Sequence, residues 1–277
     1  MTWIAIVGAG ALGGETAAAI ARRGRFDAVR LIDPAGRIAE GKALDLMQSA
    51  PVEQFSLRVT AAADAAAAAG ADVIAFADAA GGGEISGETG LALVRQICRI
   101  EDKAPLLFCG GSQLELMRRT VGELHVARSR VVGSAALALE SAVRAIVAAL
   151  LDGSPKDVSV GIAGVPPRNV VIGWEAATAF SQPVSRVLPA HELASLSARL
   201  PALWPPAPYT LASAASRIAD ALAHGSRRRL TCFTAIDSRG TVAAVPVELR
   251  RGGIKATLEP ALSRHERTLF ENGFASS

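Results

Sequence analysis

Gly8-Ala9-Gly10-Ala11-Leu12-Gly13 lies between an apolar run, Thr2–Val7, and an alanine-rich segment, Glu15–Arg23. The apolar run predicts a strand and the alanine-rich segment predicts a helix, so the glycines are expected in the turn between them. Asp33 stands twenty residues beyond Gly13, where a second apolar run, Val29–Ile32, ends. A glycine turn, a helix and an acidic residue in this order are typical of a dinucleotide-binding βαβ unit.

Each part of this glycine turn (residues 8–13) has a predicted role. Gly8 permits the tight turn, Gly10 lets the backbone approach a pyrophosphate, and Gly13 lets the helix pack closely on the sheet. Amides at the start of the helix attract phosphates. Asp33 accepts hydrogen bonds from an adenosine ribose and repels a 2′-phosphate, which predicts NAD rather than NADP. The predicted cofactor-binding residues are therefore Gly8, Gly10, Ala11, Leu12, Gly13 and Asp33.

Two alternatives remain at this point. The glycines could form only a tight turn, with Asp33 as a turn or capping residue, and the same motif also serves flavins and other adenine nucleotides.

Apolar runs continue to alternate with helical segments along the first half of the chain. Further strands are predicted at Leu57–Thr60, Asp72–Phe76, Pro105–Cys109 and Arg130–Val132, and helices at Ile38–Gln48 (ended by Pro51), Ala61–Ala71 and Thr89–Ile100. This alternation predicts an α/β fold, a Rossmann-type doubly wound parallel sheet.

The second half follows a different pattern. A helix is predicted at Ser134–Leu151 and an antiparallel strand pair at Leu230–Ala235 and Val242–Val247. We therefore expect an NAD-binding Rossmann domain over residues 1–133 and an α+β substrate-type domain over residues 134–277.

Composition narrows the classes of partner. The chain has 277 residues, 50% of them hydrophobic, 4% aromatic and 20% charged, with a net charge of +3. So few aromatic residues disfavour a base-stacking nucleic-acid module, and Arg227-Arg228-Arg229 is interpreted as a solvated turn. Charges interrupt every apolar stretch before the ~18 residues of a membrane span. Three separated cysteines, without a Cys-x-x-Cys pair, argue against a disulfide framework and fit a reducing compartment, so we expect a cytoplasmic protein. We predict no metal site.

Residues 31–51 add a more specific signal. Their core, Gly41-Lys42-Ala43-Leu44-Asp45-Leu46, resembles the malate dehydrogenase branch of the malate/lactate dehydrogenase family, and Leu139-Glu140-Ser141-Ala142 and Val245-Pro246-Val247-Glu248-Leu249 match it further along. The resemblance implies a two-domain architecture, NAD as cofactor, and homodimers packed partly through the helix at residues 38–48.

At the positions that the family uses to bind and convert its substrate, this sequence differs from the family. The family's mobile loop aligns on Asp78 to Leu91, so that its substrate-selecting arginine falls on Gly81 and its polarising arginine on Gly87. Its carboxylate-binding arginine falls on Val143 and its proton-transferring histidine on Pro166. No catalytic residue is predicted at these positions. Arg144 does not replace Val143, because one helical step turns a side chain by about 100°. The Asn-Pro pair of the family falls on Gly110-Gly111, and His125, His191, His224 and His265 match no catalytic position.

Three hypotheses follow, and they leave open whether the chain is an enzyme. The first is an NAD(H)-binding protein without malate or lactate dehydrogenase activity. The second is an NAD-dependent oxidoreductase for a larger or less anionic hydroxy or carbonyl substrate, with Glu140, Glu84 or Glu88 as the acid or base. The third is a non-catalytic partner of a dehydrogenase.

Overall fold

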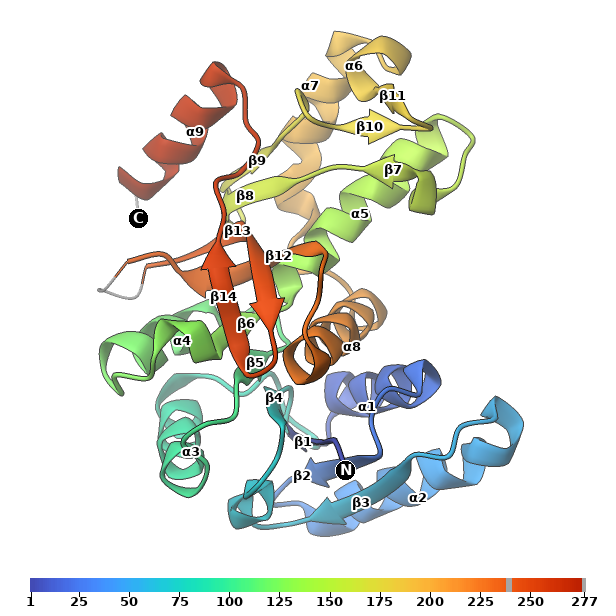
Figure 1. The fold of residues 1–277 in the computed structure, drawn as a ribbon, viewed down its shortest axis with the longest axis vertical. Coiled ribbons are helices and arrows are strands. Elements are labelled where there is room, and N and C mark those ends of the chain that lie inside the picture. The colour runs from blue at the N-terminus through green and yellow to red at the C-terminus, as the bar shows by residue number, and fades with distance from the viewer. Residues whose placement is uncertain (238–240, 276–277) are drawn as a thin grey trace.

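The fold is described by a computed structural model that covers residues 1–237 and 241–275 (Figure 1). Six parallel strands of its first half lie in the spatial order β3 (Arg58–Ala62), β2 (Ala28–Ile32), β1 (Trp3–Val7), β4 (Val73–Phe76), β5 (Leu106–Phe108) and β6 (Val131–Gly133). This is the strand order of the doubly wound dinucleotide-binding fold, and it confirms the predicted fold class.

Helices connect these strands and cover both faces of the sheet. They are α1 (Ala11–Arg23), α2 (Gly36–Glu53), α3 (Gly87–Ile100) and α4 (Leu114–Gly122). Figure 1 shows α1 and α2 on one side of the parallel strands and α3 and α4 on the other. Because both faces are covered, β1 and β4 are buried almost throughout, as parallel strands usually are.

Two local predictions in this half were wrong. The alanine run does not form a helix: Ala61 and Ala62 continue β3 in register with β2, and only a short 3₁₀ turn, η1 (Ala65–Ala68), follows, capped by Asp64. Strand pairing here outweighs the helix propensity of alanine. Helix α2 also runs through Pro51, which lies in its last turn and there removes only one backbone donor.

The second half begins with the long helix α5 (Ala135–Leu150). Its strands are β7 (Val158–Ser159), β8 (Ile162–Val165), β9 (Asn169–Ile172), β10 (Thr178–Ala179), β11 (Gln182–Pro183), β12 (Arg229–Ala235), β13 (Val242–Arg250) and β14 (Gly253–Thr257). Its other helices are α6 (Val184–Val187), α7 (Ala190–Arg199), α8 (Pro208–His224) and α9 (Arg264–Ala275), with 3₁₀ turns η2 (Arg128–Arg130), η3 (Pro155–Asp157) and η4 (Leu200–Leu203).

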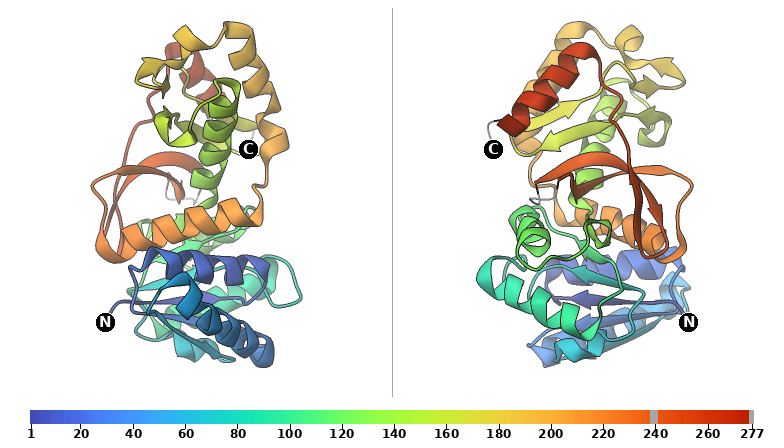
Figure 2. Two further views of the ribbon diagram at one scale, coloured as in Figure 1. Left: turned by 90° about the vertical axis from the view of Figure 1, so that its right-hand side faces the viewer. Right: turned by 60° about the vertical axis from the view of Figure 1, so that its left-hand side comes forward.

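One continuous sheet joins the two halves. β12 pairs antiparallel with β6, β13 with β12, and β8 with β13, which confirms the predicted β12–β13 pair. Helix α8 lies along α1 in both views of Figure 2. One apolar core contains the parallel strands together with α8, β12 and β13, while a second core lies around α5, α6 and α7. The elements α8, β12 and β13 follow residue 133 in the sequence but pack in the first core. A domain boundary after residue 133 therefore stays a prediction.

No helix in the described part of the chain combines the length and hydropathy that a membrane crossing requires.

Candidate functional site

The glycine turn lies at the carboxyl end of β1, and α1 begins within it. Gly8 has a positive φ of 102°, and its amide donates to the carbonyl of Ile32 at 2.7 Å. A side chain at Gly8 would collide with the backbone of Asp78, one at Gly10 with the Asp78 carboxylate, and one at Gly13 with the carbonyl of Gly8. The close helix-to-strand approach predicted for Gly13 is therefore present, and Asp78 explains why the other two positions are glycine.

Asp78 follows β4, the strand next to β1, and its carboxylate lies at the start of α1. Its Oδ1 accepts a hydrogen bond from the Gly13 amide at 2.8 Å, and its Oδ2 accepts one from the Leu12 amide at 3.1 Å. The side chain is nearly buried, with 9% of the residue exposed. Helix amides at an N-terminus lack partners within the helix, so the carboxylate satisfies them and interacts favourably with the helix dipole.

Asp33 lies at the end of β2, as predicted, and is 2% exposed. Its Oδ2 accepts hydrogen bonds from the amides of Ala9 at 2.9 Å and Ala80 at 2.8 Å, and its Oδ1 accepts one from Ala35 at 2.9 Å. Burial by itself raises the pKa of Asp33, but these three amides and the charge of Lys42 outweigh burial and hold the pKa below its usual value. Asp33 is thus an ionised residue that joins three backbone segments.

The segment after β4, residues 78–86, covers this edge of the sheet. The amide of Ile85 donates to Ala77 at 2.9 Å, and Glu84 accepts hydrogen bonds from the amides of Gly111 at 3.0 Å and Ser112 at 2.7 Å. A second carboxylate therefore binds backbone amides after β5, as Asp78 does after β1. Gly81, in contrast, is exposed and has open space around its α-carbon.

Two of the positions that the resemblance assigns to the substrate side, Val143 and Pro166, carry buried apolar side chains. Val143 is 2% exposed and belongs to the second core. Gly111 lies against Pro205 and Trp204, and the Trp204 ring packs edge-on to Phe233 with centroids 5.6 Å apart. Pro166 is also buried. These contacts leave Val143 and Gly111 in packed surroundings.

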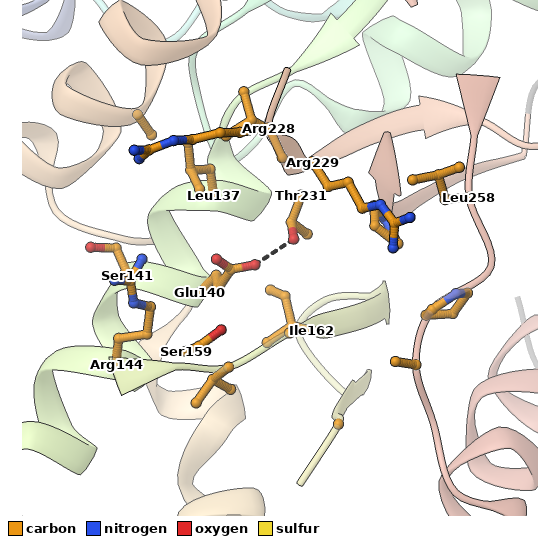
Figure 3. A pocket seen from close by; sticks show the side chains of 18 of the residues that line it. Leu137, Glu140, Ser141, Arg144, Ser159, Ile162, Arg228, Arg229, Thr231 and Leu258 are labelled. Atoms are coloured by element: carbon orange, nitrogen blue, oxygen red, sulfur yellow. Dashed lines mark hydrogen bonds between the residues drawn. The ribbon is translucent and has the colours of Figure 1, made fainter. Parts of the chain in front are cut away.

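A cavity of about 640 Å³ lies beside α5 (Figure 3). We call it the Glu140 cavity. It is lined by α5, α8, the start of β12, β7–β8 and the chain around residues 258–262, and its basic residues are Arg23, Arg144, Arg217, Arg228 and Arg229. Of the predicted solvated turn, Arg227 and Arg228 precede β12, whereas Arg229 is the first residue of that strand. Arg228 and Arg229 are exposed and also line this cavity.

Helix α5 contributes one carboxylate to this cavity, that of Glu140. It accepts a hydrogen bond from the Thr231 hydroxyl, and Figure 3 shows the two side chains facing each other. Burial raises the pKa of Glu140, and the Thr231 hydroxyl and the charge of Arg144 offset only part of that effect. The other two proposed acids differ: Glu84 binds backbone amides, and Glu88 is 82% exposed and pairs with Arg119.

The glycine turn, the α1 amides and Asp33 lie together at the carboxyl edge of the sheet, where open α/β sheets bind dinucleotides. They fit NAD in position and in donor chemistry, although the Asp78 carboxylate binds the Leu12 and Gly13 amides in this structure.

No cluster of three metal-ligating His, Cys, Asp or Glu side chains occurs among the described residues. Sequence reasoning missed Asp78 as a site residue. The available signal was a carboxylate just beyond the strand expected beside β1.

Comparison with known proteins gives consistent matches. Residues 2–103 match the lactate/malate dehydrogenase NAD binding domain. The chain is 28% identical to a malate dehydrogenase from Thermomicrobium roseum, over 95% of this chain and 92% of that protein. It is 29% identical to one from Desulforudis audaxviator, over 99% and 95%.

Solved structures show the same fold. The malate dehydrogenase of Salinibacter ruber superposes with a TM-score of 0.86 at 21% identity, covering 99% of this chain and 95% of that one. The lactate dehydrogenase of Cryptosporidium parvum, solved with lactic acid and nicotinamide adenine dinucleotide, gives 0.85 at 19% identity, with the same coverage.

Proposed function

This chain belongs to the malate/lactate dehydrogenase family, and from that premise we propose that it binds NAD(H) without being an authentic malate or lactate dehydrogenase. One observation carries the second part of the proposal. Of the four positions that the resemblance assigns to the proton-transferring imidazole and the substrate-binding guanidiniums, two are glycine, one is valine and one is proline (Gly81, Gly87, Val143 and Pro166).

The family chemistry needs those groups for physical reasons. A positioned imidazole takes the hydroxyl proton as hydride leaves, and guanidinium groups bind the substrate carboxylate in a bidentate manner. Pro166 has no titratable side chain, and Val143 is packed in an apolar core. Glycine at positions 81 and 87 supplies no charge. These four residues therefore supply neither a guanidinium for the substrate carboxylate nor a group that takes up the hydroxyl proton.

The nucleotide side retains its parts. We assign cofactor binding to Gly8, Gly10, Ala11, Leu12, Gly13 and Asp33, with the amides of Leu12 and Gly13 toward the pyrophosphate and Asp33 toward the adenosine ribose. NAD supplies the hydride-accepting ring when bound. The negative charge of Asp33, whose pKa is lowered, favours NAD over NADP.

We extend the proposal to organisation and location. The domains are residues 1–133 and 134–277, and the chain forms a homodimer through α2, where Leu44 is 59% exposed and Ile38 48% exposed. Replacing Leu44 with Asp should then lower the mass measured by light scattering to that of one chain.

The free thiols of Cys98, Cys109 and Cys232 favour a cytoplasmic location.

The test combines binding and turnover. Calorimetry with NADH should show binding, while malate and lactate with NAD should give no absorbance change at 340 nm at ordinary enzyme rates, about 1–10³ s⁻¹. Turnover of either acid in that range would refute the proposal.

The Glu140 cavity favours a second candidate, an NAD-dependent oxidoreductase for another carbonyl compound. Burial raises the pKa of Glu140, and a buried carboxyl with a raised pKa is a candidate proton donor or acceptor. A panel of aldehydes and ketones tests this candidate through NADH oxidation. Any activity found must disappear in Glu140→Gln and persist in Glu88→Gln.

A further inference from the structure

The start of α1 already binds an anion, the chain's own Asp78. We propose that Asp78 is an internal competitor of the dinucleotide pyrophosphate, so that NAD(H) binds only after this carboxylate leaves the Leu12 and Gly13 amides. The inference rests on the proposed NAD(H) binding and concerns the control of that same site.

The competition follows from shared donors. Asp78 lies 2.8 Å from the Gly13 amide and 3.1 Å from the Leu12 amide, and these are donors that a helix N-terminus offers to a phosphate group. Its carboxylate also packs against Gly10, so closely that a Cβ at Gly10 would overlap it. Gly10 is the position at which a pyrophosphate approaches the backbone in this type of turn. One anion can occupy this place, and a second one nearby is repelled.

The backbone on either side of the carboxylate is fixed. The Gly10 amide donates to the Asp78 carbonyl at 2.8 Å, and the Ala77 amide donates to Val7 at 2.9 Å. The main chain of Asp78 therefore remains beside the turn when a ligand enters, and the side chain must rotate away. Two residues on, the Ala80 amide holds Asp33, so the same segment also covers the carboxylate that is expected to meet the ribose.

Asp78 thereby sets the affinity for the cofactor. Part of the binding free energy of NADH is used to break two charge-assisted hydrogen bonds and to move a negative charge. Removing the carboxylate should tighten NADH binding by roughly tenfold to a hundredfold. Asp78→Asn, which keeps the shape and removes the charge, should give a smaller gain.

The experiment compares the full-length wild-type protein with Asp78→Ala and Asp78→Asn. The dissociation constant for NADH is measured by calorimetry, and amide resonances of Leu12 and Gly13 are followed by NMR during titration with inorganic pyrophosphate. Asp64→Asn is the matched control, because the Asp64 carboxylate also caps a backbone amide, that of Ala66, in an exposed turn. Its dissociation constant should stay within about twofold of wild type.

The outcomes separate this inference from the proposed function. Tighter NADH binding in both Asp78 variants, with pyrophosphate shifting the two resonances more strongly than in wild type, supports it. Equal NADH affinity and equal pyrophosphate shifts in wild type and Asp78→Ala overturn it, and so does a pyrophosphate titration that moves the resonances in neither protein. If NADH binds to none of the proteins while pyrophosphate shifts the resonances only in the Asp78 variants, the inference stands and the proposed NAD(H) binding fails.

Discussion

Asp33 and Ala80 are joined by a hydrogen bond of 2.8 Å from the Ala80 amide to the Asp33 carboxylate. Asp33 ends β2 and Ala80 belongs to the segment after β4, so the bond spans the end of β1, which lies between these two strands. The same carboxylate binds the amides of Ala9 and Ala35. A residue predicted to recognise a ribose therefore also holds together the backbone at this edge of the sheet.

Replacing Asp33 with Asn should destabilise the protein. The change removes the charge that three backbone amides share, and the expected cost is about 1–3 kcal/mol of unfolding free energy at pH 7. Urea unfolding followed by circular dichroism measures it. Because the pKa of Asp33 is lowered in the folded state, its stabilisation is present above the unfolded value of 3.8 and is lost as pH falls through the folded value.

The difference between wild type and Asp33→Asn should therefore be constant from pH 7 to about pH 5 and shrink below about pH 4. A difference that grows on acidification would contradict the structure around Asp33.

Replacing Glu84 with Ala should cost about 1–2 kcal/mol, because the Gly111 and Ser112 amides lose their acceptor. Glu88→Ala is the control. Its carboxylate belongs to the same stretch of chain but is 82% exposed, so the change should cost less than about 0.5 kcal/mol. Both values come from urea unfolding at pH 7, and equal losses would count against the capping role of Glu84.

Replacing Glu140 with Gln should make the protein more stable than wild type at high pH. Burial raises the pKa of Glu140, so its ionisation costs folding free energy as pH rises through the interval between its unfolded and folded pKa values. The amide of the Glu140→Gln variant keeps an acceptor for the Thr231 hydroxyl and does not ionise. The advantage of this variant should therefore grow upward from about pH 4.5, as measured by urea unfolding across pH. A stability advantage that does not change with pH would indicate that the Glu140 side chain is solvated in the folded protein.

Replacing Val143 with Arg, the residue type expected there from the family resemblance, should destabilise the second core by roughly 3–5 kcal/mol. An unpaired guanidinium would be buried among apolar side chains. Ala145→Arg on the exposed face of α5 is the matched control and should leave thermal unfolding nearly unchanged. If Val143→Arg is tolerated as well as its control, the position is not part of the core.

Local patterns predicted much of the fold. The apolar run Thr2–Val7 and the helix after the glycine turn agree with β1 and α1, and the alternation of strands with helices predicted the parallel sheet. The alanine run failed because alanine propensity is weak beside the pairing of β3 with β2. Helix α4 was not predicted.

The site was less predictable. Asp78 and Gly13 are 65 positions apart, and Glu84 and Ser112 are 28 apart. Such contacts depend on which strands become neighbours, which no local pattern specifies.

By itself, the sequence determined that residues 8–13 form a turn between a strand and a helix, because glycine spacing and apolar periodicity act over a few residues. It also determined that positions 81, 87, 143 and 166 lack imidazole and guanidinium groups. Only the tertiary structure decided that the Asp78 carboxylate binds the start of α1 and that Glu140 faces a cavity. Both arrangements arise from sheet order and packing, which bring together groups that are distant along the chain and change the solvation and hydrogen bonding of their charges.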